Sequence, residues 1–157
     1  LAAAPAKVAA RGKDGLALLE AAARPAARLA AAAPAHGAQG DGAAALALGY
    51  AAGQSAPGLV VASGRLDATG ALVAGLQPGM AGAPVFDREG RFLGLARPFA
   101  VPRLVAGVAP AAPHGLIAAR EAAVFAGLPA GAEPARGGAA ELARTYGAAL
   151  APVACGR

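Results

Sequence analysis

Short apolar runs alternate with turns marked by glycine, proline and aspartate along most of this chain, and this pattern predicts β-strands. The clearest runs in the first half are residues 16–19, 45–50 and 59–64, and the second of them follows the turn Gly40-Asp41-Gly42. Runs of this length between turn residues are typical of strands in small antiparallel sheets. The first half of the chain is therefore expected to be mainly β-structure.

The most distinct hairpin of the sequence joins residues 84–86 to residues 91–96. Its turn reads Asp87-Arg88-Glu89-Gly90, with Asp and Gly at the positions where they support a tight reversal. Three shorter strands are expected at 72–74, 104–108 and 115–118.

Near the C-terminus the pattern changes from strand to helix. Residues 119–125 contain no helix breaker, and Gly127 and Pro129 then predict a helix end. A second helix is expected at 139–149, after a glycine-rich linker. A run of strands followed by helices predicts an all-β fold, a small antiparallel β-barrel with a helical tail. The alanine-rich residues 21–35 fit either a helix or a loop, since prolines interrupt them.

Composition and charge change this picture little. Hydrophobic residues form 57% of the 157-residue chain, but aromatic residues form only 4%. The 23 Gly and 13 Pro fit a fold with many turns. The net charge of +5 comes from cations spaced singly, with few aromatic rings between them. That spacing argues against a nucleic-acid partner, and no apolar run is long enough for a membrane span.

Residues that could hold a metal or cofactor are sparse. The two histidines lie far apart, carboxylates are not paired, and Cys155 is the single cysteine, with no partner in this chain. This set contains no recognisable metal site, no phosphate loop and no dinucleotide fingerprint, so no cofactor is expected.

The segment 76–96 carries the most specific motif of the chain. It reads LQPGMAGAPVFDREGRFLGLA. This segment resembles the nucleophile loop and following hairpin of trypsin-like serine proteases, especially the bacterial HtrA-like branch, with Ala81 where serine is required. In such a loop, the N–H of the nucleophile residue and the N–H two residues earlier form the oxyanion hole. The resemblance therefore implies that Gly79 and Ala81 supply these donors, while Ala81 has no hydroxyl with which to attack.

The resemblance extends weakly upstream. Residues 42–50 and 60–64 resemble two strands of the family, with Ala51 where proline is usual. Residues 15–19 resemble the family strand that begins with the aspartate of the triad. Gly15 occupies the aspartate position, and Asp14 lies one residue early, where a strand would send it to the opposite face. Asp14 could serve as the acid only if this strand begins later than predicted.

Downstream, residues 105–108 and 114–117 resemble the closing strands, and 119–127 resembles the terminal helix. The resemblance implies that residues 1–130 are an N-terminally truncated trypsin-like domain, the second barrel with a remnant of the first. Six strands would lie within 44–118, and residues 131–157 would be a linker and helical tail. A start at Leu1 instead of Met fits a processed or shortened chain.

The triad histidine of the family belongs to the first barrel. His36 and His114 stand in the wrong context and are expected to be surface or structural residues. Ser55 and Ser63 are the only serines, and neither has the frame of a nucleophile.

Three functions remain open. The first is a pseudoprotease that binds an extended peptide or unfolded segment by strand addition, since loss of the nucleophile costs on the order of a million-fold in a related triad enzyme. The second is a serine protease that is active in a full-length, serine-containing form. The third is a β-rich structural module unrelated to proteases. The resemblance implies a periplasmic or secreted location.

Overall fold

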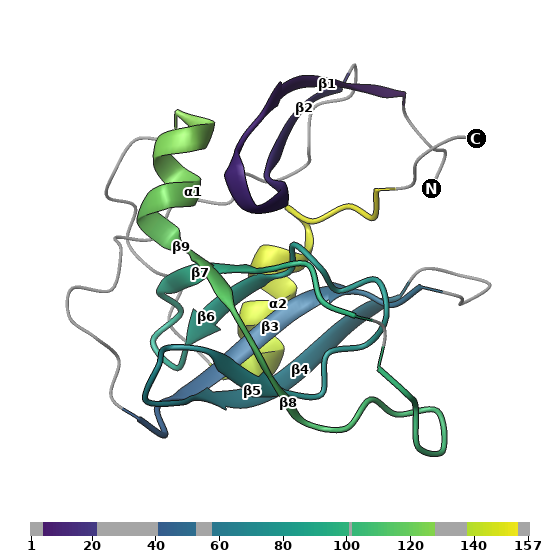
Figure 1. Ribbon diagram of the computed structural model, residues 1–157, viewed down its shortest axis with the longest axis vertical. Coiled ribbons are helices and arrows are strands. Elements are labelled where there is room, and N and C mark those ends of the chain that lie inside the picture. Colours follow the sequence, from purple (N-terminus) through teal and green to yellow (C-terminus); the bar gives the residue numbers. More distant parts are fainter. Residues whose placement is uncertain (1–4, 22–40, 53–57, 101, 128–137, 154–157) are drawn as a thin grey trace.

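The computed structural model describes residues 5–21, 41–52, 58–100, 102–127 and 138–153. Its main feature is a seven-stranded antiparallel sheet that curls into a nearly closed barrel, accompanied by two short helices (Figure 1). The predicted fold class, an all-β barrel with a C-terminal helix, is confirmed. The barrel strands are β3 (Ala44–Tyr50), β4 (Leu59–Leu66), β5 (Leu72–Ala74), β6 (Pro84–Asp87), β7 (Phe92–Ala96), β8 (Ala112–His114) and β9 (Leu116–Ala118).

The barrel nearly closes through a single stretch of chain. The strand order is β8-β5-β4-β3-β6-β7-β9, so β8 and β9 lie at opposite edges of the sheet. Only Gly115 separates them in sequence; β8 pairs with β5, and β9 pairs with β7. The sheet therefore has seven strands within residues 44–118 instead of the six expected, because the closing stretch is divided at Gly115 into β8 and β9.

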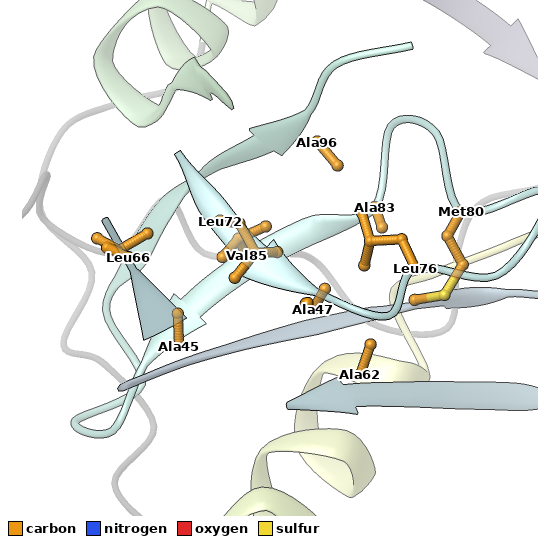
Figure 2. Close-up of a cluster of buried hydrophobic side chains, with 11 residues drawn as sticks. Ala45, Ala47, Ala62, Leu66, Leu72, Leu76, Met80, Ala83, Val85 and Ala96 are labelled. Atoms are coloured by element: carbon orange, nitrogen blue, oxygen red, sulfur yellow. The ribbon is translucent and has the colours of Figure 1, made fainter. Parts of the chain in front are cut away.

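The barrel interior is built from small side chains. Strand β3 shows the principle, because successive side chains of a strand point to opposite faces. Ala45 and Ala47 belong to the interior cluster, whereas Leu46 and Leu48 belong to a second cluster on the outer face. Six of the eleven interior residues are alanine, which fits a narrow barrel. The interior residues, most of them labelled in Figure 2, are Ala45, Ala47, Ala62, Leu66, Leu72, Ala74, Leu76, Met80, Ala83, Val85 and Ala96.

The two helices cover the outer face. Helix α1 (Ala119–Ala126) ends at Gly127, whose φ of 62° allows its N–H to cap the Ala123 and Val124 carbonyls. Helix α2 (Ala139–Gly147) buries Leu142 and Tyr146 against the barrel wall. The Tyr146 ring stacks on Phe86, with centroids 4.5 Å apart. The predicted helical tail therefore shares a hydrophobic core with the barrel.

A separate hairpin precedes the barrel (Figure 1). Strands β1 (Ala6–Arg11) and β2 (Ala17–Ala21) form a two-stranded sheet, and the short 3-10 turn η1 (Lys13–Gly15) lies between them. Every residue of both strands is exposed. The sequence pattern predicts β2, with a start one residue too early, but it does not predict β1.

The prediction of a strand at 104–108 is wrong. Val105 and Val108 form an isolated bridge around a tight turn, in which Ala106 and Gly107 both have positive φ, 50° and 79°. Two left-handed residues reverse the chain at once, so this apolar run cannot continue as a strand. The strand forms later, at β8, although Pro113 argues against one there.

Candidate functional site

The loop at residues 79–84 leads into β6 and forms hydrogen bonds with the chain at the ends of β3 and β7, the two strands that flank β6 in the sheet. The Ala52 N–H, just beyond β3, donates to the Pro78 carbonyl (2.6 Å). The Gly82 N–H donates to the Ala96 carbonyl (2.8 Å), and the Ala96 N–H donates to the Ala83 carbonyl (2.9 Å). Residue 96 ends β7, so the loop is held between the ends of β3 and β7.

Two consecutive turns shape this loop. The Met80 N–H donates to the Gln77 carbonyl (3.1 Å), and the Ala83 N–H donates to the Met80 carbonyl (3.0 Å). Gly79 and Gly82 have φ values of 95° and 81°, which side chains rarely adopt. At Gly79 a Cβ atom would also lie 2.6 Å from the Ala52 nitrogen. The spacing of glycines in the motif therefore has a direct structural cause.

Met80 anchors the loop from inside the barrel. Its side chain is 1% exposed and lies beside Leu76 and Ala83 in the interior cluster (Figure 2). Its sulfur accepts the Gln77 N–H at 3.4 Å. The residues on either side, Gly79 and Ala81, are both exposed. Burial of Met80 thus presents its two neighbours to solvent.

The backbone donors of the loop fall into two groups. The N–H groups of Met80, Gly82 and Ala83 each donate to a carbonyl oxygen. Within the described part of the chain, neither the Gly79 N–H nor the Ala81 N–H donates a hydrogen bond. The two residues that the resemblance singles out are thus exposed, and their N–H groups have no partner among the described residues. Their role in an oxyanion hole stays a prediction.

Ala81 leaves this loop without a nucleophile, since its side chain is a methyl group. Ser63 lies on β4, paired with Leu46 and exposed, in a regular strand. Ser55 lies outside the described residues. Among the described residues, the 79–84 loop therefore contains no side chain that could act as a nucleophile.

Asp14 lies at the same end of β7 as the loop, but its carboxylate is already paired. It sits in η1 with a φ of 56°, and β2 begins later than predicted, at Ala17. Asp14 therefore lies outside the strand. Its Oδ1 is 2.7 Å from the Arg97 guanidinium, and Arg97 directly follows the strand end that holds Gly82. At the end of β7, Ala96 thus contacts the loop through Gly82, and the next residue, Arg97, contacts the candidate acid Asp14.

The sequence analysis did not single out Arg97 as the partner of Asp14. The two residues are 83 positions apart, and nothing in the local pattern around either one indicates the contact. The nearest signal is Gly15, where a Cβ atom would lie 3.1 Å from Pro98. That glycine allows the η1 turn to approach the chain just after β7.

His114 is a structural residue in this fold. It is 8% exposed, and its Nε2 lies 3.1 Å from the Ala74 carbonyl oxygen of the paired strand β5. Its ring meets Phe99 edge-on, with centroids 4.7 Å apart. This agrees with the structural role expected from its context. His36 lies outside the described residues.

Shifted ionisation equilibria occur in turns away from the loop. The Thr69 hydroxyl, followed by the backbone N–H groups of Ala71 and Thr69, holds the pKa of Asp67 below its ordinary value. A hydrogen bond from Arg91 to Asp87, together with the charges of Asp87 and Glu89, raises the pKa of the Arg91 guanidinium. Both cases are explained by turn structure and do not indicate acid–base chemistry.

Among the residues that the structure describes, no three His, Cys, Asp or Glu side chains gather as metal ligands. No helix in the described ranges is long and apolar enough to cross a membrane. Cys155 lies outside those ranges.

Comparison with known proteins yields no relative for this chain. No protein-family model, no curated protein and no solved structure matches it.

Proposed function

We propose that this chain is a homologue of the trypsin-like serine proteases, of the HtrA-like bacterial branch, that does not cleave peptides by a triad and instead holds an extended peptide at the 79–84 loop. The observation that carries the proposal is the pair of exposed residues Gly79 and Ala81, on either side of buried Met80, whose N–H groups have no partner among the described residues. In the proposed complex, these N–H groups donate hydrogen bonds to the peptide backbone without any covalent step.

The remaining groups favour binding over hydrolysis. Ala81 has no hydroxyl, the Asp14 carboxylate is paired with Arg97, and the His114 imidazole is engaged by the Ala74 carbonyl. A triad needs a nucleophile, a base and an acid in one hydrogen-bonded row. None of these three described residues can complete such a row in the observed arrangement.

The barrel itself lends further support. The family resemblance implies a six-stranded barrel within residues 44–118, and these residues form a nearly closed sheet of seven strands, two of which, β8 and β9, are separated only by Gly115. A barrel is also compatible with a structural module unrelated to proteases, so the binding experiment below separates the two. Export to the periplasm or the medium belongs to the same proposal.

The test is a titration of the isotope-labelled chain with an unstructured casein peptide, followed through backbone amide resonances. We expect the Gly79 and Ala81 amides to shift most. The Met80 and Ala83 amides, whose hydrogens are already bonded to carbonyls, should shift least. Binding elsewhere, with Gly79 and Ala81 unmoved, would overturn the proposal and favour a structural module.

A matched pair of glycine variants sharpens this test. Gly79→Ala places a Cβ atom 2.6 Å from the Ala52 nitrogen and should displace the loop and weaken peptide binding at least tenfold. Gly70→Ala introduces a similar strain, at a φ of 80°, but its Cβ would meet open space. The Gly70 variant should bind the peptide as the unaltered chain does.

Restoring the hydroxyl addresses the active-protease alternative. We expect Ala81→Ser, introduced into the full-length protein, to leave casein intact, because Asp14 lies outside β2 and is paired with Arg97 and so does not supply the orienting acid of a triad. Robust casein cleavage by this variant would contradict inactivity and favour a protease that is active in its serine-containing form.

A further inference from the structure

A groove of about 610 Å³ lies between the turn of the N-terminal hairpin and helix α1. One wall comes from residues around η1, and the other comes from the end of β9 and the first two turns of α1. Figure 1 shows the hairpin and α1 at the same end of the barrel. None of the groove residues belongs to the 79–84 loop, so this site is separate from the proposed peptide site.

Three cations converge on this groove. Arg11 and Lys13 come from the hairpin side, and Arg120 comes from α1. Among the described residues, none of the three forms an ion pair. Glu121 is the only carboxylate in the described lining, and it also forms no ion pair. Three cations against one carboxylate leave the described lining of the groove with an excess of positive charge.

The floor between these cations is apolar. Leu16 from the hairpin lies opposite Val124 and Phe125 from α1. Phe125 packs closely on Gly12, where a Cβ atom would lie 2.8 Å from the ring. Val124 is 75% exposed. Contact with the apolar part of a ligand would remove this surface from water.

We propose that this groove binds a small organic anion with an apolar body, namely a carboxylate whose alkyl chain lies on Leu16, Val124 and Phe125. The carboxylate head would lie between Arg120 and the hairpin cations, where charge-assisted hydrogen bonds are available. The volume falls within the range of about 300–1,000 Å³ that is typical of small-ligand sites. Charge complementarity selects an anion, and the apolar floor selects one with a hydrocarbon part.

The test uses decanoate as the probe and the intact chain as the receptor. We expect saturable binding of one decanoate, with chemical-shift changes at the Leu16 and Val124 methyl groups. Decanol, which has the same chain without the charge, should bind at least tenfold more weakly. Equal affinity for decanol would overturn the role of the cations.

Two charge-reversal variants distinguish decanoate binding in the groove from nonspecific attraction to the net positive charge of the protein. Arg120→Glu should weaken decanoate binding at least tenfold. Arg144→Glu changes the net charge equally, but Arg144 is an exposed residue of α2 outside the groove, so this variant should retain affinity within twofold. Equal losses in both variants would overturn the proposal. Both residues are exposed, and circular dichroism checks that each variant folds.

A third variant tests the floor, and a control keeps the two proposals apart. Val124→Ser removes exposed aliphatic surface and should weaken binding several-fold while the charges remain. Unchanged affinity in this variant would overturn the role of the floor. Decanoate should leave the Gly79 and Ala81 amides unshifted. Failure to bind decanoate overturns only the groove, whereas failure to bind the casein peptide overturns only the function proposed for the loop.

Discussion

Strand β3 of the barrel and the β1–β2 hairpin are both antiparallel β-structure with similar alanine-rich sequences, yet their surroundings are opposite. Five consecutive residues of β3 are buried, whereas every residue of β1 and β2 is exposed. Strand β3 pairs with β4 over seven residues without interruption, but the β1–β2 register shifts between Val8 and Ala10. Strands of similar composition therefore differ in burial. Side chains of β3 pack into the barrel interior on one face and into the outer cluster with the helices on the other, whereas the strands of the hairpin have no such cover.

Because of this difference, we expect the barrel core to account for most of the stability of the fold, and only a few contacts to hold the hairpin against the barrel. A two-stranded sheet without a covering layer is marginally stable in water. The hairpin meets the rest of the molecule through the Asp14–Arg97 ion pair and close approaches at Gly12 and Gly15. Variants in the two regions should thus differ in kind: one set alters global unfolding, and the other alters local opening.

The largest expected effect on the free energy of unfolding comes from truncating a large side chain in the hydrophobic cluster on the outer face of the barrel. Phe86 is fully buried, stacked on Tyr146 and 5.9 Å from the Phe92 ring centroid. Phe86→Ala should lower the free energy of unfolding by about 3–5 kcal/mol, through lost burial and a residual cavity. The measurement is urea unfolding at equilibrium, followed by circular dichroism.

Leu19→Ala is the matched variant in the hairpin. Leu19 is 38% exposed and pairs with the exposed Val8. Its truncation should cost less than about 1 kcal/mol, because little of this surface leaves water on folding. Losses of similar size in both variants would show that the hairpin is covered by a further layer, and the comparison would fail.

The barrel strands other than β8 were predictable from sequence because local signals suffice for them. The hairpin from residue 84 to 96 is bounded by its own turn residues, and β3 follows a glycine-marked turn. Strands β8 and β9 depend on pairing with β5 and β7, which lie well before them in the chain. That long-range pairing overrides the unfavourable Pro113. At Ala106 and Gly107 the apolar pattern gave no sign of a left-handed turn.

The candidate site likewise has features that local sequence predicts and features that depend on long-range contacts. The turns of the 79–84 loop follow from glycine spacing, and the structure shows positive φ at Gly79 and Gly82. The pairing of Asp14 with Arg97 depends on how the hairpin meets the end of β7, which no local pattern encodes. The sequence analysis did not predict the groove between the hairpin and α1 for the same reason, since its two walls come from residues about a hundred positions apart in the chain.

A smaller effect is expected from the ion pair that ties the hairpin to the barrel. Both members are more than a third exposed, so solvent screens the pair, and a double-mutant cycle of Asp14→Asn and Arg97→Gln should give a coupling of about 0.5 kcal/mol. The clearer readout is hydrogen exchange. Amides of β1 and β2 should exchange several-fold faster in either variant, while those of β3 keep their protection.

Lys7→Gln is the control for this cycle. It breaks the Lys7–Glu20 pair (3.1 Å), which lies within the hairpin and makes no tie to the barrel. This variant should leave exchange of the η1 amides unchanged. If β3 amides lost protection together with the hairpin in Asp14→Asn, the two regions would unfold as one unit, and the division drawn above would be wrong.

The smallest expected effect concerns the turn between β4 and β5, where the carboxylate of Asp67 has local partners, in contrast to the long-range pair of Asp14. Asp67 accepts hydrogen bonds from the Thr69 hydroxyl (2.6 Å) and from the Thr69 and Ala71 amides (2.9 and 3.0 Å). These bonds hold the pKa of Asp67 below its ordinary value of 3.8. A lowered pKa in the folded state means that the stabilisation is present above pH 3.8 and is lost as the pH falls through the folded pKa.

Unfolding midpoints measured from about pH 5 down to about pH 2 should therefore fall less steeply for Asp67→Asn than for the unaltered chain. Thr69→Val removes the strongest of the three hydrogen bonds and should give an intermediate slope, since the pKa of Asp67 then rises toward its ordinary value. Parallel curves for all three proteins would contradict the lowered pKa. Hydrogen exchange of β1 and β2 should not distinguish the three, because Asp67 stabilises the β4–β5 turn locally and makes no contact with the hairpin among the described residues.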